Sequence, residues 1–194
     1  WNARVSGGFH RIDAFDLDKK ELTTSGSAVS QWNVASRTEY RLNKAAAIRL
    51  TTSYLNRDKK GVDARSTGAV FDRRNLTEVL SATLGSEFKA SKEAKLRVTG
   101  YYSLFRDQYV LDQRGAAAGD QDQETREQLG QLSVQYDHFL LDQHLVTIGS
   151  EATYELLETP RIDNETGDRF RGAVFLQDEW TLSDDPVLVY VPGV

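Results

Sequence analysis

The chain has 194 residues, enough for one domain with a sizeable core, and its formal net charge of −5 argues against a general nucleic-acid binder. It contains no cysteine, so disulfides and thiolate metal sites are excluded. No stretch approaches the roughly 18 consecutive apolar residues of a membrane helix. Trp1 already lies within an alternating pattern, so we expect the natural chain to begin before it.

Apolar and polar residues alternate with a period of two over nearly the whole chain, which predicts β-strands rather than helices. In the segment 28–42, for example, Trp32 and Tyr40 fall on one face, whereas Arg37 and Glu39 fall on the other. We predict nine strands, at 1–15, 28–42, 46–57, 76–88, 95–107, 127–138, 144–157, 170–180 and from 187 onwards.

The predicted connections alternate in length. The long ones are 16–27, 58–75, 108–126 and 158–169, and the short ones are 43–45, 89–94, 139–143 and 183–186. Short turns at one end and long loops at the other are typical of an outer-membrane barrel, in which the short turns are periplasmic. We therefore predict an all-β fold, an antiparallel transmembrane β-barrel meander, with the loops 58–75 and 108–126 outside the cell.

The aromatic residues support this prediction. On strands of alternating direction, those of the less polar face sort into two belts, at the heights where amphipathic rings meet the two membrane interfaces. We predict that this face, formed by the even-numbered residues of the second to seventh strands, contacts outer-membrane lipid. The belt near the short turns comprises Trp1, Tyr40, Phe88, Tyr136 and Trp180, and the belt near the long loops comprises Phe9, Trp32, Tyr54, Tyr102, Tyr154 and Phe170.

The opposite face carries many charges, which would be prohibitive in a dry core but not in a wet lumen. This disfavours a soluble lipocalin-like carrier. The charged residues are Arg37, Glu39, Arg41, Arg49, Arg57, Glu87, Arg97, Glu151, Glu155 and Glu179.

The segment 174–194, with Gln177-Asp-Glu-Trp180 and later Pro192-Gly193, resembles a barrel hairpin of TonB-dependent outer-membrane receptors. The segment 144–154 looks like the preceding strand of ferrienterochelin-type and colicin-type receptors, and 70–75 looks like one of their loop-to-strand junctions. The resemblance covers most of the chain as a pattern but is specific only at 174–194. It implies that residues 1–194 are part of a larger barrel of the 22-strand type, without the plug domain, the TonB box and the remaining strands.

The resemblance also implies a function: energy-coupled import of a ferric siderophore or a similar scarce chelate, through the TonB system acting on the plug, with no catalysis and no resident cofactor or metal. Cationic side chains in the loop 58–75 would suit an anionic ferric chelate. The candidate ligand-binding residues are Lys59, Lys60, Arg65, Arg73 and Arg74. An ordinary solvated loop is the alternative reading of the same charges.

Two other functions stay open. One is a complete small outer-membrane barrel with a structural or adhesive role. The other is an outer-membrane barrel hydrolase that uses His10, His138 or His144, although the chain has neither a Gly-x-Ser-x-Gly nor a His-Glu-x-x-His motif. The ligand itself is not specified by the residues, because siderophores, haem, cobalamin and glycans all enter through such barrels.

Overall fold

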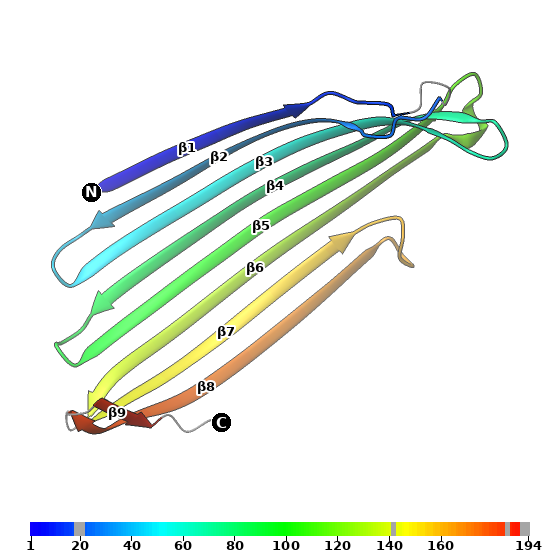
Figure 1. The fold of residues 1–194 in the computed structure, drawn as a ribbon. Coiled ribbons are helices and arrows are strands. Elements are labelled where there is room, and N and C mark those ends of the chain that lie inside the picture. The colour runs from blue at the N-terminus through cyan, green and yellow to red at the C-terminus, as the bar shows by residue number, and fades with distance from the viewer. Residues whose placement is uncertain (18–21, 141–142, 185–186, 191–194) are drawn as a thin grey trace.

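The computed structural model describes residues 1–17, 22–140, 143–184 and 187–190, and it forms one antiparallel sheet whose nine strands follow in sequence order (Figure 1). The predicted meander is therefore confirmed. The strands are β1 (Asn2–Ile12), β2 (Ala28–Arg41), β3 (Ala46–Ala64), β4 (Val70–Lys89), β5 (Ala94–Gln113), β6 (Gln121–Leu140), β7 (His144–Glu158), β8 (Thr166–Asp184) and β9 (Val187–Tyr190). No described helix is long or apolar enough to cross a membrane.

The register keeps residues of one parity on one face. From β2 to β8, even-numbered residues pair with even-numbered residues, as Tyr54 does with Val34 and Leu80. The parity changes between β1 and β2, where Val5 lies opposite Ser36, and again at a register shift between β8 and β9, where Ser183 lies opposite Leu188. Because side chains alternate along a strand, the even residues of β2–β8 and the odd residues of β1 share one face, which we call the apolar face. The odd residues of β2–β8 form the opposite, polar face.

The sheet has almost no core. Among the described residues, the only buried hydrophobic side chains are Phe71, Ala94 and Leu111. On the apolar face, by contrast, Phe170 is 69% exposed and Val174 is 84% exposed. Domains normally bury the apolar face of a sheet against a second layer, and Figure 1 shows a single layer. The described residues therefore leave the apolar face uncovered.

The sheet is also open. Its strand order runs from β1 to β9 without a pairing between the first and last strands. The described residues thus do not form the closed small barrel considered as an alternative above. Unpaired sheet edges are a liability in water and are not tolerated in hydrocarbon.

The predicted loops 58–75 and 108–126 are wrong as loops. Most of these residues belong to strands. β3 ends only at Ala64 and β4 begins at Val70; likewise, β5 ends at Gln113 and β6 begins at Gln121. We call these extensions, residues 58–75 and 107–125, the outer hairpins; in Figure 1 they project at the upper right beyond β1–β2 and β7–β8. Their connections, 65–69 and 114–120, each contain a glycine with positive φ, 83° at Gly68 and 82° at Gly115.

The reason for this error is local chemistry. In the outer hairpins both faces carry polar or charged residues, so the apolar alternation that marks a strand is lost. The backbone ladder nevertheless continues, with Lys60 opposite Arg74 and Gln108 opposite Asp122. Smaller boundary differences occur at β1, which ends at Ile12 instead of residue 15, and at β8, which runs on to Asp184.

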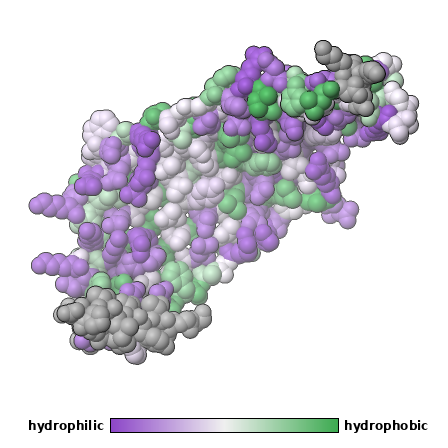
Figure 2. Space-filling model, viewed as in Figure 1, coloured by the Kyte–Doolittle hydropathy of each residue, from purple (hydrophilic) through white to green (hydrophobic). Residues whose placement is uncertain are grey.

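The other end of the sheet carries the short turns. Residues 42–45 join β2 to β3 and residues 90–93 join β4 to β5, while the β6–β7 and β8–β9 connections include residues outside the described ranges. Figure 2 shows long hydrophilic side chains projecting at this end, on the left of the view. We call it the short-turn end.

Candidate functional site

The aromatic residues of the apolar face lie at two levels along the strands. Ten of the eleven predicted belt residues lie within strands on this face, and Trp1 directly precedes β1. In the belt far from the short turns, Phe9 lies opposite Trp32, whose ring centroid is 4.8 Å from that of Tyr54. In the belt at the short-turn end, Tyr40 lies next to the last residue of β2.

The distance between the belts suits a bilayer. Trp32 and Tyr40 are eight residues apart along β2, and Phe170 and Trp180 are ten residues apart along β8. At about 3.3 Å per residue, these spacings correspond to roughly 26–33 Å along a strand. A tilted strand of that length spans the apolar band of about 25 Å found in outer-membrane barrels.

The belts also slope across the sheet. The row of paired residues that starts at Trp32 on β2 ends at Thr166 on β8. The belt residue of β8 is instead Phe170, which lies four residues closer to the short-turn end than Thr166. The other belt shifts in the same direction, by six residues between Tyr40 and Trp180. Over six strand steps of about 4.8 Å, these shifts give a strand tilt of roughly 25–35°, which approaches the tilt of about 35–45° in membrane barrels.

The polar face is held by paired charges and hydroxyls. Asp137 accepts hydrogen bonds from Arg97 (2.8 Å), Gln135 (2.8 Å) and Thr147 (3.0 Å). The Oγ atoms of Ser53 and Ser81 lie 2.7 Å apart. All ten charged residues predicted to face a lumen occupy odd positions of β2–β8 and therefore lie on this face.

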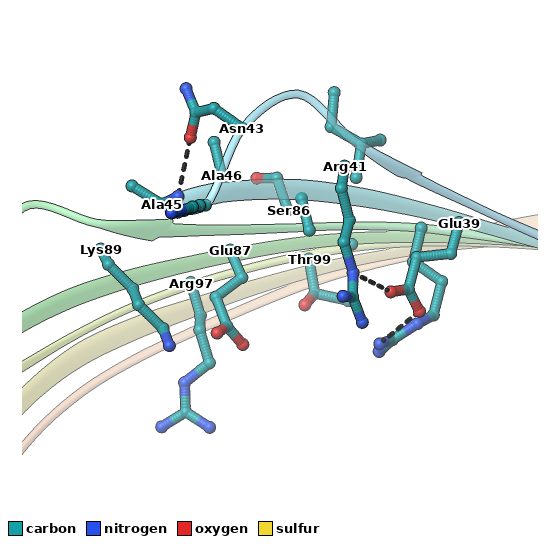
Figure 3. A pocket seen from close by; sticks show the side chains of 15 residues that line it. Glu39, Arg41, Asn43, Ala45, Ala46, Ser86, Glu87, Lys89, Arg97 and Thr99 are labelled. Carbon is teal, nitrogen blue, oxygen red and sulfur yellow. Dashed lines mark hydrogen bonds and ion pairs between the residues drawn. The ribbon is translucent and has the colours of Figure 1, made fainter. Parts of the chain in front are cut away.

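The polar face is hollowed at the short-turn end. The hollow has a volume of about 800 Å³ and is lined from β2 to β5 and by the β2–β3 turn. Figure 3 shows side chains of its β2, β4 and β5 residues, among them Arg41, Glu87 and Arg97, on the same side of the sheet. Glu39 accepts hydrogen bonds from Arg41 (3.3 Å) and Arg49 (3.2 Å).

The charges around this hollow do not balance. Two anions, Glu39 and Glu87, face five cations, so the lining has a formal net charge of +3 in a chain whose net charge is −5. We call it the cationic hollow; its charged lining residues are Glu39, Arg41, Lys44, Arg49, Glu87, Lys89 and Arg97. Sequence reasoning placed several of these residues on the inner face but missed the hollow, because only the antiparallel register brings positions 39 to 97 together.

The predicted ligand-binding residues do not share one face. Lys60 and Arg74 are on the apolar face, Lys59 and Arg73 are on the polar face, and Arg65 is in the β3–β4 turn. Three of them, Lys60, Arg73 and Arg74, contribute to the lining of a hollow of about 470 Å³ at the outer hairpins.

Most of these cations already have partners. Arg74 donates two hydrogen bonds to Asp58 (2.9 and 3.0 Å), and Lys60 lies 3.3 Å from the same carboxylate. Arg73 lies 2.8 Å from Asp63. The Arg65 guanidinium stacks over the Phe71 ring at 4.6 Å. In the outer hairpins, most cations are thus neutralised by nearby carboxylates, and they do not form a concentrated cationic site.

These pairs shift the acid–base properties of the outer hairpins. Burial alone would raise the pKa of Asp58, but hydrogen bonds from Arg74 and Lys60 outweigh this effect and hold the pKa below its ordinary value. A hydrogen bond from Arg114 likewise lowers the pKa of Asp72. With a lowered carboxyl pKa, the ion pairs stabilise the hairpins above the ordinary aspartate pKa, and this stabilisation is lost as the pH falls through the folded-state pKa.

The histidines do not converge on one site. The His144 Nδ1 atom lies 3.2 Å from Asp178 Oδ2, and its ring packs edge-on against Trp180 at 5.2 Å. The His138 ring stacks on Tyr136 at 6.0 Å. Both belong to the apolar face near the short-turn belt, whereas His10 is on β1, opposite Gln31. Within the described ranges, no group of three or more His, Asp or Glu side chains could hold a metal ion.

The Asp58–Arg74 pair allows a direct test. We expect a double-mutant cycle of Asp58→Asn and Arg74→Gln, measured by urea unfolding of the intact protein in lipid vesicles, to give a coupling energy of about 0.5 kcal/mol at pH 7, because the pair is partly exposed. The coupling should weaken as the pH falls below the ordinary aspartate pKa of about 3.9, and it should be lost once the carboxyl is protonated. Coupling that is unchanged at acid pH would contradict this account of the pair.

No protein family model matches the sequence, and no curated protein matches it. Among solved structures, the chain is similar to the crystal structure of BauA, the ferric preacinetobactin receptor from Acinetobacter baumannii, with a TM-score of 0.57 and 10% sequence identity. The similar region covers 84% of this chain but only 30% of that receptor. At this identity the likeness concerns the fold alone. The chain therefore has the predicted fold class, an antiparallel β-barrel meander, present here as an open sheet.

Proposed function

We propose that the chain is part of an outer-membrane receptor that imports a ferric siderophore or a similar scarce chelate. The observation that carries this proposal is the single-layer sheet with two unlike faces: an exposed apolar face bounded by two sloping aromatic belts, and a charged polar face behind it. The likeness of the fold to a ferric preacinetobactin receptor supports the choice of cargo.

The apolar face supports the membrane part of the proposal. Between the two belts it presents Leu84, Leu132 and Val174 with exposed fractions of 54%, 52% and 84%. A contiguous apolar surface of this kind indicates an interaction with lipid or protein. Because both belts slope in the same direction across the sheet, lipid with interfaces at two fixed heights accounts for the pattern more simply than a protein partner.

The polar face supports the transport part. Its charges are spread over the whole face from β2 to β8, which suits a water-filled or plugged lumen rather than a dry core. Nine strands in an open sheet cannot enclose a lumen, so we propose that they form part of a larger barrel of the 22-strand type. A plug domain inside that barrel would couple transport to the TonB system.

For the ligand, the proposed first contact is the outer hairpins. Their location fits the surface that meets a solute arriving from outside the cell, and the proposed contact residues are Lys59, Lys60, Arg65, Arg73 and Arg74. Of these, Lys59 lies in the backbone ladder of β3, but its side chain has no hydrogen bond, ion pair or ring contact with another described residue, so its charge is the most available to an anionic chelate. The ion pairs of Lys60, Arg73 and Arg74 reduce what each can contribute.

We propose no catalytic activity. A hydrolase of this fold would need a nucleophile, a base and an orienting group in mutual contact. His138 and His144 instead lie on the apolar face, among belt aromatics such as Tyr136 and Trp180. Rings at this height suit the membrane interface, which makes hydrolysis the weaker candidate function.

The membrane orientation predicts unequal effects of arginine on the two faces. Leu50→Arg or Val134→Arg places a cation on the apolar face near mid-height and should destabilise the protein in lipid vesicles by about 2–4 kcal/mol. Ser53→Arg and Gln135→Arg, on the polar face of the same strands, should have small effects. The measurement is the urea unfolding free energy of each variant. Equal costs on both faces, or larger costs on the polar face, would refute the orientation.

Uptake under iron limitation tests the function. Cells that carry the intact gene should take up iron from one member of a siderophore panel that includes ferric preacinetobactin. Uptake of that chelate should disappear when the gene is deleted, and also when the energy-coupling system is deleted. A controlled re-expression of the gene should restore it.

Two outcomes contradict this proposal. Uptake that persists without the coupling system would indicate a passive channel. Uptake that is unchanged by deletion of the gene, over the whole panel, would show that iron chelates are not the cargo.

A further inference from the structure

We propose that Arg73 exchanges two partners that exclude each other: a short strap of the chain, which it holds in this structure, and an anionic group of the cargo. The strap comprises residues 22–27, which precede β2, and in Figure 1 it lies at the upper right, beside the first outer hairpin (58–75). The strap thereby regulates the availability of Arg73. This inference rests on the proposed function, because Arg73 is one of its proposed contact residues.

The strap is tied to the edge of β3. The pairing of β2 with β3 ends where Ala28 lies opposite Lys60, so β3 continues beyond its β2 partner. The strap takes the place of β2 at Val62. The Thr24 N–H donates a hydrogen bond to the Val62 carbonyl (3.0 Å), and the Val62 N–H donates one to Thr24 Oγ1 (3.0 Å). The strap therefore covers a strand edge that would otherwise be open.

Arg73 reaches the strap because Gly61 lies between them without a side chain. Gly61 is directly opposite Arg73 in the β3–β4 pairing, and Arg73 Nη2 donates a hydrogen bond to Ser27 Oγ (3.1 Å). A Cβ atom at position 61 would lie 3.0 Å from Ser27 Oγ and 3.1 Å from Arg73 Nη2, closer than ordinary van der Waals contact. The absent side chain thus gives the guanidinium a path across β3.

Both terminal nitrogens of Arg73 are engaged in this arrangement. Nη1 donates a hydrogen bond to Asp63 Oδ2 (2.8 Å), and Nη2 donates one to Ser27 Oγ. An arginine recognises an anion best through two parallel N–H groups of its fork. An anion that joined the fork here would also meet the carboxylate of Asp63, and like charges repel. Arg73 therefore binds an anionic chelate only after its guanidinium turns away from Asp63 and Ser27.

Competition for one group couples the strap to the ligand. The strap and the anion each weaken the binding of the other by the same factor. We expect this factor to be about two to ten, the effect of one partly exposed hydrogen bond. A multivalent chelate that also contacts Lys59, on the same face of the sheet, offsets this loss, whereas a simple monovalent anion does not. The strap thus makes Arg73 selective for multivalent chelates.

Spin labelling of the intact protein in lipid vesicles tests the competition. A nitroxide label replaces Leu22, a strap residue that is 69% exposed, and its spectrum reports strap mobility. Pyrophosphate, a small multivalent anion, is the probe, and sodium chloride at equal ionic strength is the control for screening. We expect pyrophosphate, but not chloride, to increase the mobility of the label, because it withdraws Arg73 from Ser27.

Variants show whether Arg73 mediates this response. Ser27→Ala removes the competing acceptor and should lower the pyrophosphate concentration at half-maximal response by about two- to tenfold. Gly61→Ala crowds the same contact and should act in the same direction. Arg73→Gln should leave the strap mobile and insensitive to pyrophosphate. The matched control is Arg114→Gln, which breaks an ion pair with Asp72 away from the described strap contacts and should keep the wild-type response.

Failure of this inference is distinct from failure of the proposed function. A label that ignores pyrophosphate, a response that survives Arg73→Gln, or a Ser27→Ala variant that needs more pyrophosphate than the wild type would overturn the inference, whether or not the protein takes up iron. An Arg73-dependent response in a protein that imports no iron chelate would support the strap mechanism and contradict the proposed cargo.

Discussion

The hydrogen-bonded register from β2 to β8 is the constraint on which every other feature depends. Because each pairing keeps even residues opposite even residues, a slip of one position in any strand would move its apolar side chains among the charges of the polar face. The change of parity between β1 and β2 is matched by a change in the sequence pattern, since Val5 and Phe9 are odd-numbered. Seven strand pairings thus agree on one face, and this agreement produces the belts, the polar wall and the hollow.

The period-two pattern predicted the parts of the fold in which one face is apolar. Trp32, Tyr40 and their counterparts could be assigned to belts because a strand's direction and parity fix the height and face of each ring. The outer hairpins could not be predicted, since pairs such as Asp58 with Arg74 replace apolar alternation and look like loop charges in a linear sequence. The register then showed that the predicted ligand-binding cations lie on different faces.

The cationic hollow illustrates a different limit. Arg41 and Arg97 are far apart in the sequence, and each looks like an ordinary inner-face charge. Only the pairing of the four strands β2–β5 shows that the cations gather at one end of the polar face. The anions Glu151 and Glu155 lie elsewhere on this face, on β7. The polar face is therefore not uniform, because cations outnumber anions at its short-turn end. The apolar face, in contrast, is defined by two aromatic belts that cross the sheet from β1 to β8.

Solvent accessibility along β6 tests the central claim, that the two faces meet lipid and lumen. Spin labels placed one at a time at positions 129–136 of the intact protein in bilayers would be probed with oxygen, which concentrates in lipid, and with a water-soluble nickel complex. Our account predicts alternation: labels at Leu132 and Val134 accessible to oxygen, and labels at Gln131 and Ser133 shielded from lipid. The opposite alternation, or none, would contradict the account.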